Sequence, residues 1–337
     1  MIPIGTFVKF FEEMTKGDIQ EAGGKAANLG ELTQAGFNVP SGFCVLANAL
    51  HHHIEKNNLQ PKINGIIPGF DYEDYAIIDS KTNEIRDLII SAPIPDDLLR
   101  ELMDSINKLT GPDRVFVAVR SSVAVKSLPI SSFPGMMDTF HYLKETEEIL
   151  KHIKLCWASL WTSRATFNRF HKKIDHHLGL IAPIVQKMIN PEVAGILFTA
   201  NPITSSQKEM VIEANWGLGE SVVSGKSMND FFSLDKATLQ IKQRKIAKKT
   251  VMVCFDEEKG VGRKEITVNP DLMDRPTLSD DQVQELGQTG LKIERLFGSP
   301  QDIEWAFEKG NLFILQSRNI KNLKEYKEEE NHGTKDC

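Results

Sequence analysis

The stretch from Gln301 to Arg318 reads Gln-Asp-Ile-Glu-Trp-Ala-Phe-Glu-Lys-Gly-Asn-Leu-Phe-Ile-Leu-Gln-Ser-Arg. Polar and apolar residues alternate on both halves, and a glycine lies between them, which predicts a β-hairpin. The two halves present matching faces only if the loop has an odd number of residues. Lys309-Gly310-Asn311 is therefore the predicted loop, with Glu308 opposite Leu312.

In that register Glu304 lies opposite Gln316, and Asp302 lies opposite Arg318. The two acids, the amide and the guanidinium form a polar face. Oxygen ligands with few formal charges suit Mg²⁺, which takes the rest of its ligands from phosphates and water. The guanidinium of Arg318 suits a phosphate oxygen. A surface hairpin with a solvated polar face remains open as an alternative. The apolar face is predicted to pack on a core and contains Ile303, Trp305, Phe307, Phe313, Leu315 and Ser317.

Length and composition limit the classes of protein to which this chain can belong. The chain has 337 residues, which suggests two structural units. Its 41% hydrophobic and 26% charged residues are typical of a soluble globular protein, and a net charge of −6 argues against nucleic acid as a partner. We expect neither a signal peptide nor a membrane span, because no stretch has the required pattern. The four cysteines lack CxxC spacing, which indicates a reducing cytoplasm rather than disulfides or zinc.

Residues 21–36 predict a glycine turn that opens a helix, which Gly36 ends. Lys25 follows two glycines whose N–H groups can approach a ligand closely, so it is a candidate phosphate ligand. For a single Gly-Gly-Lys, a solvated lysine at a helix start is the more economical interpretation.

Residues 114–122 predict a short apolar strand with Arg120 near its end. The small-residue stretch 123–137 follows and is predicted to be a loop, and residues 138–143 resume as a strand. An arginine that leads into such a loop fits a lid over phosphates, while pairing with a carboxylate is the structural alternative.

The rest of the chain alternates helical and strand patterns. Residues 83–109 predict two helices separated at Pro93-Ile-Pro95, residues 146–173 one long amphipathic helical stretch, and residues 279–297 a helix with Ser279 as N-cap and Gly298 beyond its end. Strands are predicted at 181–189, 194–199, 209–214 and 230–234, a charged strand-and-loop region at 241–268, and a loop at 61–80.

Two motif-like stretches are interpreted as non-functional. Consecutive residues of a helix point in different directions, so His51, His52 and His53 cannot bind one metal ion together and are predicted to lie on the surface. Gly225-Lys226-Ser227 is not the end of a P-loop, because Glu220 stands where the first glycine is required and no helix pattern follows.

Taken in order, these motifs resemble the N-terminal nucleotide-binding domain of the phosphoenolpyruvate synthase, pyruvate phosphate dikinase and rifampin phosphotransferase family. The resemblance covers about residues 15–320. The matching stretches are residues 23–32 (Gly-Gly-Lys-Ala-Ala-Asn-Leu-Gly-Glu-Leu), 39–43, 119–122 (Val-Arg-Ser-Ser), 134–139, 185–188, 217–225, 302–305 (Asp-Ile-Glu-Trp) and 315–318 (Leu-Gln-Ser-Arg).

The resemblance implies an α+β, ATP-grasp-type fold of two lobes, with ATP and Mg²⁺ in the cleft between them. Residues 1–185 would form the N-terminal lobe with the Gly-Gly-Lys and Arg-Ser-Ser phosphate loops. Residues 186–320 would form the C-terminal lobe with the adenine strand and the Mg-binding hairpin. Residues 321–337 would be a charged tail or linker.

The resemblance also implies roles for single residues. Lys25 and Arg120 would hold phosphates and, with Arg318, act in catalysis. The other implied contacts are Thr139 at the phosphates, Gln186 and the Lys187–Ile189 backbone (with Met188) at the adenine, Glu304 and Gln316 at Mg²⁺, and Glu220, Asp302 and Arg318 in the polar wall.

The sequence departs from the family pattern in two places. Synthase-type relatives carry Ala-Thr-Ala-Glu-Asp after Arg-Ser-Ser, whereas this chain has Val123-Ala-Val-Lys-Ser127, so a lysine replaces an acid in the expected lid. None of its nine histidines has the glycine-rich setting of the family's phosphohistidine domain. We therefore expect the histidine to be on another domain or subunit.

The predicted function is that of a cytoplasmic phosphotransferase module. It would bind Mg·ATP and present the phosphates to that histidine for transfer to a small acceptor, with no nucleic acid or membrane involved. Pyruvate is the expected acceptor, and a phenol, as in phenylphosphate synthase, or a rifamycin hydroxyl are alternatives. A non-catalytic ATP-sensing or scaffold subunit and a free-standing ATP-grasp ligase are rival functions.

Overall fold

The computed structural model describes residues 6–125, 139–223, 227–320 and 323. Most of the predicted lid, residues 225–226 of the rejected P-loop and nearly all of the predicted tail lie outside these residues. The chain divides into two compact units, which are described one at a time. The first contains Met1–Asn190, Cys254–Glu265 and Phe313–Gln316, and the second contains Pro191–Val253, Ile266–Leu312 and Ser317–Cys337.

The first unit is built on a five-stranded antiparallel sheet with the order β1-β2-β5-β3-β4. Its strands are β1 (Val8–Phe10), β2 (Gly42–Val45), β3 (Val117–Val125), β4 (Thr139–Leu143) and β5 (Gly179–Lys187). Its α-helices are α1 (Ile19–Gln34), α2 (Ala47–Lys56), α3 (Gln60–Ile66), α4 (Tyr75–Ser91), α5 (Asp96–Thr110), α6 (Thr146–Ala158) and α7 (Ser163–His171). Short 3-10 turns add η1 (Phe11–Glu13), η2 (Lys16–Asp18), η3 (Ile67–Gly69), η5 (Ser159–Trp161) and η6 (His176–Leu178).

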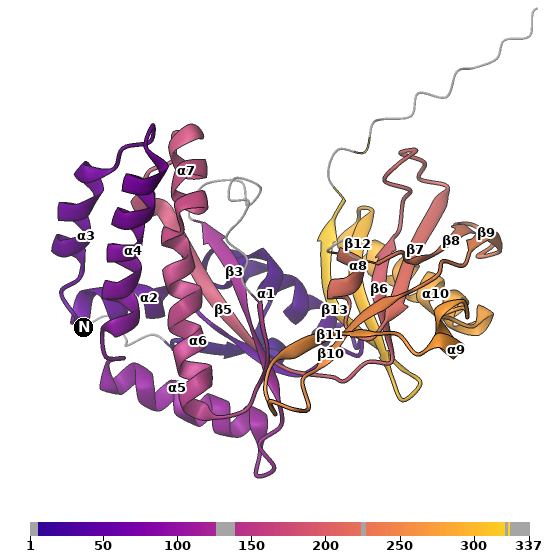
Figure 1. The fold of residues 1–337 in the computed structure, drawn as a ribbon. Helices are drawn as coiled ribbons and strands as arrows, with labels where there is room; N and C mark the ends of the chain where they lie inside the picture. Colours follow the sequence, from indigo (N-terminus) through magenta and orange to yellow (C-terminus); the bar gives the residue numbers. More distant parts are fainter. Residues whose placement is uncertain (1–5, 126–138, 224–226, 321–322, 324–337) are drawn as a thin grey trace, which may run out of the picture. The chain divides into compact units, whose positions relative to one another are not determined.

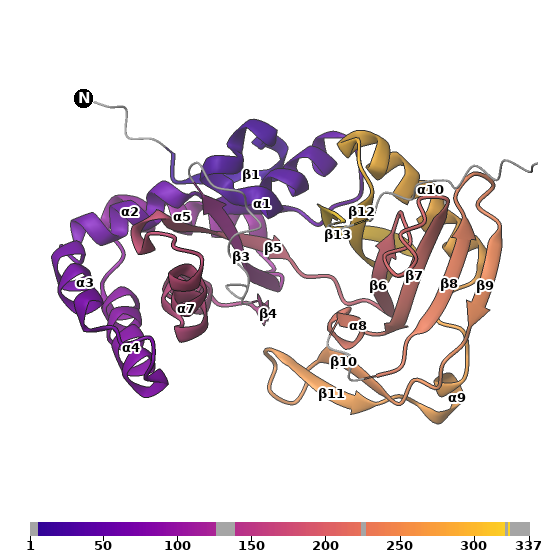
Figure 2. The same ribbon diagram turned by 90° about the horizontal axis from the view of Figure 1, so that it is seen from above.

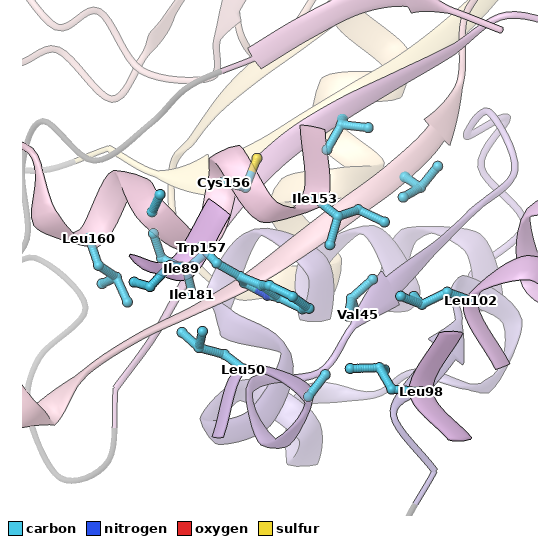
Figure 3. Packing of buried hydrophobic residues seen from close by; sticks show 14 of the residues in the cluster. Val45, Leu50, Ile89, Leu98, Leu102, Ile153, Cys156, Trp157, Leu160 and Ile181 are labelled. Carbon is cyan, nitrogen blue, oxygen red and sulfur yellow. The ribbon is translucent and has the colours of Figure 1, made fainter. Parts of the chain in front are cut away.

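Apolar side chains cover both faces of this sheet, since strand residues point alternately to opposite sides. Figure 2 shows α1 on one side of β3 and β5 and α7 on the other. Ala22, Ala26 and Leu29 of α1 pack with Cys44 and Ile184. The helices of the other face form the larger core, and Figure 3 shows Trp157 of α6 inside it among side chains that include Val45, Ile89 and Ile181.

Most predicted helices of this unit are present, with two corrections. The break at residues 93–95 separates α4 from α5, as predicted. The stretch 61–80 is not a loop: Pro61 lies in the first turn of α3, where its missing N–H costs no hydrogen bond, and the Asp74 side chain caps α4. The stretch 146–173 is not one helix, because α7 restarts at Ser163 with Thr162 as its N-cap.

His53 is not a surface residue. Its side chain is buried on α2, its Nε2 lies 3.1 Å from the carbonyl oxygen of Ile89, and its ring lies 5.1 Å from that of Trp157. Burial lowers the pKa of His53 below its usual range, so the ring is neutral near pH 7. Of the three consecutive histidines His51 is exposed, His52 is half-buried and His53 is buried, because a helix turns each successive residue by about 100°.

The second unit is a six-stranded sheet with the order β13-β12-β6-β7-β8-β9. Its strands are β6 (Val193–Phe198), β7 (Glu209–Trp216), β8 (Asp230–Asp235), β9 (Ile241–Lys245), β12 (Gln301–Glu308) and β13 (Asn311–Asn319), of which residues 313–316 belong to the first unit. A separate pair is formed by β10 (Val251–Phe255) and β11 (Arg263–Thr267), and the helices are α8 (Glu220–Val223), α9 (Pro270–Met273) and α10 (Asp280–Phe297). The tip of the β10–β11 pair, residues 254–265, belongs to the first unit.

Helix α10 packs on one face of the six-stranded sheet (Figure 1). As predicted, Ser279 caps its start in a capping box with Gln282, and Gly298 follows its end in the left-handed conformation. At Gly290 an added Cβ would lie 2.7 Å from Leu197 and 2.8 Å from Met210, so the helix approaches the sheet too closely for a larger residue. No helix among the described residues is long and apolar enough to cross a membrane.

The predicted hairpin exists as β12 and β13, but its turn is one residue shorter than predicted. Only Lys309 and Gly310 lie between the strands, with φ of 50° and 78°, as a tight two-residue turn requires. On β12 the predicted apolar face of Ile303, Trp305 and Phe307 is buried, but Asp302 and Ala306 of the predicted polar face are buried as well. It is wrong on β13, where the buried residues are Leu312, Ile314, Gln316 and Ser317.

Candidate functional site

Helix α1 contains a kink that gives it a second starting point. Gly23 has φ 75° and ψ 163°, which is not helical, so helical geometry resumes at Gly24 and Lys25. An added Cβ on Gly23 would lie 2.4 Å from Ser122 Oγ. The Ser122 hydroxyl donates to the Ala22 carbonyl oxygen at 2.8 Å and accepts from the Ala26 N–H at 3.4 Å, which fixes the kink against β3. The N–H groups of a helix start favour an anion, and the half-buried Lys25 adds a positive charge there.

Arg120 lies on β3 two residues before Ser122 and therefore on the same face of the sheet. Its guanidinium donates to the Leu315 carbonyl oxygen at 3.0 Å and to the side-chain oxygens of Gln186 and Gln316, each at 3.4 Å. These three acceptors are neutral oxygens on two other strands, and they orient the guanidinium. Gln186 itself is buried on β5 and donates to the Pro40 carbonyl oxygen at 3.1 Å.

Thr139 and Met188 flank this arrangement. Thr139 is the residue of β4 directly opposite Arg120 in the antiparallel register. The N–H of Met188 donates to the Phe116 carbonyl oxygen at 2.9 Å, so that N–H is already used by the protein. The residues from β3, β4, β5 and β13 named here thus meet within the first unit.

In the second unit, Asp302 and Arg318 form an ion pair across the hairpin. Both Nε and Nη2 of Arg318 lie 2.7 Å from Asp302 Oδ2. Burial raises the pKa of the Asp302 carboxyl above its usual range, Arg318 acts in the opposite direction, and the nearby Glu304 adds to the rise. Glu304 is half-buried on the same strand, so this part of the hairpin carries two neighbouring acids.

Glu220 begins the short helix α8, which follows a close backbone approach. Gly217 has φ 74°, and an added Cβ there would lie 2.3 Å from the carbonyl oxygen of Val253. Leu218 N–H donates to that same oxygen at 2.8 Å. The glycine-rich stretch therefore turns tightly against β10 and places Glu220 in the second unit. Among the described residues, β8 rather than a helix follows this stretch, as predicted.

Comparison with known protein families indicates the class of ligand that this site binds. The family described as the AMP/ATP-binding domain of pyruvate phosphate dikinase matches residues 19–336. The chain belongs to this family. Its fold is α+β, and its ligand class is the adenine nucleotide that the family description states.

Curated relatives of this AMP/ATP-binding domain are named phosphoenolpyruvate synthase or rifampicin phosphotransferase. The chain is 42% identical over 326 residues to a probable phosphoenolpyruvate synthase of Methanocaldococcus jannaschii, covering 96% of this chain and 27% of the relative. It is 39% identical over 360 residues to the phosphoenolpyruvate synthase of Pyrococcus furiosus, covering 95% and 44%. It is 37% identical over 333 residues to the rifampicin phosphotransferase of Bacillus cereus, covering 98% and 38%. The chain thus spans less than half the length of each.

Magnesium fits the side chains of this AMP/ATP-binding domain by their chemistry. The described residues contain no group of three or more His, Cys, Asp or Glu side chains arranged for a metal ion. Mg²⁺ needs no such group, because it is commonly bound by one or two carboxylates together with substrate phosphates. Glu304 raises the pKa of Asp302, and a cation would relieve this mutual repulsion. Glu304 therefore offers a carboxylate oxygen of the kind that such an ion binds.

The sequence placed Ser122 in the Arg-Ser-Ser segment but gave its side chain no role of its own, although it lies beside the candidate residues of the AMP/ATP-binding domain. Its side chain joins α1 to β3 at the kink that positions Lys25. The alternation of side chains along a strand could have indicated this role, because it places Ser122 on the same face of β3 as Arg120. The contact itself joins residues about 100 positions apart, and only the fold brings them together.

Proposed function

We propose that this chain binds Mg·ATP and presents its β- and γ-phosphates to a histidine on a separate domain or subunit, for transfer to a small acceptor. The main support for the proposal is the position of Arg120. Oxygens of β5 and β13 orient its guanidinium, which lies on the face of the sheet that contacts the kink of α1. An oriented guanidinium beside a helix start is suited to a polyphosphate. Membership in an AMP/ATP-binding family supports the same ligand.

The proposed roles follow from the chemistry of each side chain. Lys25 and the N–H groups at the restart of α1 bind phosphate oxygens, and Thr139 lines the phosphate site. Arg120 and Arg318 balance the negative charge that develops on the transferred phosphoryl group, so catalysis rests on positioning and electrostatics. Glu304 and Gln316 would hold Mg²⁺, which neutralises phosphate charge when bound.

The remaining contacts are proposed on the same basis. Gln186 and the backbone at Met188 would lie beside the adenine. Glu220 and Asp302 would complete the polar wall. We also propose that the fold is of the ATP-grasp type, with residues 1–185 and 186–320 as its lobes. The presence of two units, each built on an antiparallel sheet, supports a fold of two lobes.

Pyruvate is the proposed acceptor, because the phosphoenolpyruvate synthases cover 95% or more of this chain at about 40% identity. A rifamycin hydroxyl is a second candidate, favoured by the Bacillus cereus relative, which covers 98% of the chain. Turnover with each acceptor, in the presence of the matching histidine domain, would distinguish the two.

Calorimetric titration of Mg·ATP tests the binding site. We expect micromolar-range binding by the wild type and its loss in the double variant Glu304→Ala/Gln316→Ala. The control is Glu308→Ala/Asn311→Ala, which makes the same kind of change at the turn end of the same hairpin and should bind like the wild type. Absence of binding by the wild-type protein would contradict the proposal.

Phosphoryl transfer is tested with ATP labelled on its β- and γ-phosphates and a separately produced histidine domain from the Pyrococcus furiosus relative. We expect acid-labile label on the histidine domain, and no label when its histidine is replaced by alanine. Tight ATP binding without any transfer would instead favour a non-catalytic sensor or scaffold subunit.

A further inference from the structure

Strand β4 contains a β-bulge opposite Ala118. Val119 pairs with Phe140 and Val117 pairs with Leu143, so His141 and Tyr142 both lie opposite Ala118. In a regular strand, residues three apart point to opposite faces, whereas here both Phe140 and Leu143 pack against the large apolar core. The extra residue, with Tyr142 at φ 57°, makes this possible.

The bulge therefore turns His141 and Tyr142 away from that core, to the face of Thr139 and Arg120. Tyr142 is buried there, with its ring 5.8 Å from that of Phe116 and 4.8 Å from that of Phe255. His141 is half-buried and lies beside the tip of the β10–β11 pair.

The hydrogen bond of His141 fixes the position of its ring proton. Nη1 of Arg263 lies 3.1 Å from Nδ1 of His141. A guanidinium can only donate, so Nδ1 accepts and the proton of the neutral ring is on Nε2. Burial first, and then the positive charges of Arg263 and Arg120, lower the pKa of His141 to about 3. The ring is thus an uncharged donor with one defined tautomer.

The position of His141 indicates which part of a ligand it meets. Ala118 pairs with Gln186 on one side and with the bulge on the other, so the small methyl group of Ala118 separates His141 from Gln186. The row formed by His141, Ala118 and Gln186 lies two residues along β3 from Arg120, which is about 6.6 Å at the usual rise of a strand. Within the part of the chain that the structure describes, the bond from Arg263 is the one hydrogen bond of the His141 ring.

We propose that His141 is a further nucleotide-binding residue, which donates its Nε2–H to the base or ribose of the bound nucleotide. This inference rests on the proposed function, because it uses Arg120 as the phosphate end of the site. Arg263 acts as a positioning residue: it holds the imidazole in the tautomer that donates. The rings of Phe116, Tyr142 and Phe255 provide an apolar border on the same side.

The first test compares the dissociation constants of ATP, ADP, AMP and tripolyphosphate in calorimetric titrations. We expect His141→Ala to weaken ATP, ADP and AMP by a similar factor of about three to ten, the usual effect of one neutral hydrogen bond, and to leave tripolyphosphate unchanged. His141→Gln, which keeps an N–H donor, should recover part of the loss. His177→Ala, a change at an exposed histidine of the same unit, is the control.

The second test observes the proton directly by ¹⁵N NMR of labelled histidine. We expect a neutral His141 ring with the proton on Nε2, an Nε2–H signal that shifts when AMP is added, and the second tautomer in Arg263→Ala. The charged groups that face the ring, Arg263 of β11 and Arg120 of β3, are both cations that keep it neutral. The affinity ratio of wild type to His141→Ala should therefore be constant from pH 6 to pH 8.

The outcomes separate this inference from the function on which it rests. Normal nucleotide binding by both His141 variants would overturn the contact and leave the proposed function standing. A loss confined to ATP and tripolyphosphate would place His141 at the phosphates and also overturn it. Absence of nucleotide binding by the wild type would overturn both.

Discussion

Arg120 donates to three oxygens on two other strands, a geometry that suits the planar fork of a guanidinium. Arg120→Lys keeps the charge but cannot make these contacts together. We expect it to weaken Mg·ATP about ten- to hundredfold in calorimetric titration, as loss of a charge-assisted hydrogen bond implies. Arg164→Lys, at an exposed position of α7, should bind like the wild type. Equal affinities for the two variants would argue against Arg120 as a phosphate ligand.

The pKa of Asp302 also depends on the residues around it. Burial raises the pKa of its carboxyl above the ordinary 3.8, and Arg318 limits the rise. The pKa of Asp302 is higher in the folded state than in the unfolded state, so the folded protein binds this proton more tightly. The contribution of Asp302 to the free energy of unfolding therefore falls as the pH rises from the unfolded-state pKa to the folded-state pKa. In Arg318→Ala we expect a still higher pKa of Asp302 in ¹³C NMR titration. A lower value would show that the ion pair does not stabilise the carboxylate.

At the scale of the element, the restart of α1 depends on Gly23. Gly23→Ala forces a side chain into a left-handed conformation and brings its Cβ within 2.4 Å of Ser122 Oγ. We expect a loss of about 2 kcal/mol or more in the free energy of unfolding, measured by urea denaturation. The matched control is Gly36→Ala, which has φ 82° but open space around the Cβ. It should cost roughly 1 kcal/mol, so the difference reports the contact with β3.

Elements with a strong local signal could be predicted from the sequence, and those set by packing could not. The Ser279 and Gly298 caps of α10 and the proline break between α4 and α5 are local, and both predictions were correct. The hairpin was predicted, but its turn and the burial of β13 were not. Strand β13 also contacts a segment far away in the sequence, where Ile314 N–H donates to the Asn38 carbonyl oxygen. Local alternation carries no information on such a distant partner.

At the scale of the whole molecule, the proposed nucleotide contacts come from both units, with Arg120 in the first and Glu304 in the second. A ligand bound by both units stabilises both, by about 2.7 kcal/mol at a concentration of 100 times the dissociation constant. In differential scanning calorimetry, saturating Mg·ATP should therefore raise the unfolding temperature of every resolved transition. If two transitions appear and only one moves, the nucleotide contacts one unit alone.

The sequence by itself determined the types and order of most elements, the family and the candidate residues, because caps, breaks and motif order are local properties of the chain. It left the positions of those residues as expectations. Only the tertiary structure placed Arg120 against Gln186 and Gln316, Ser122 against the kink at Gly23, and His53 in the core. These contacts join distant parts of the chain, so they depend on strand order and helix packing, which no local pattern encodes.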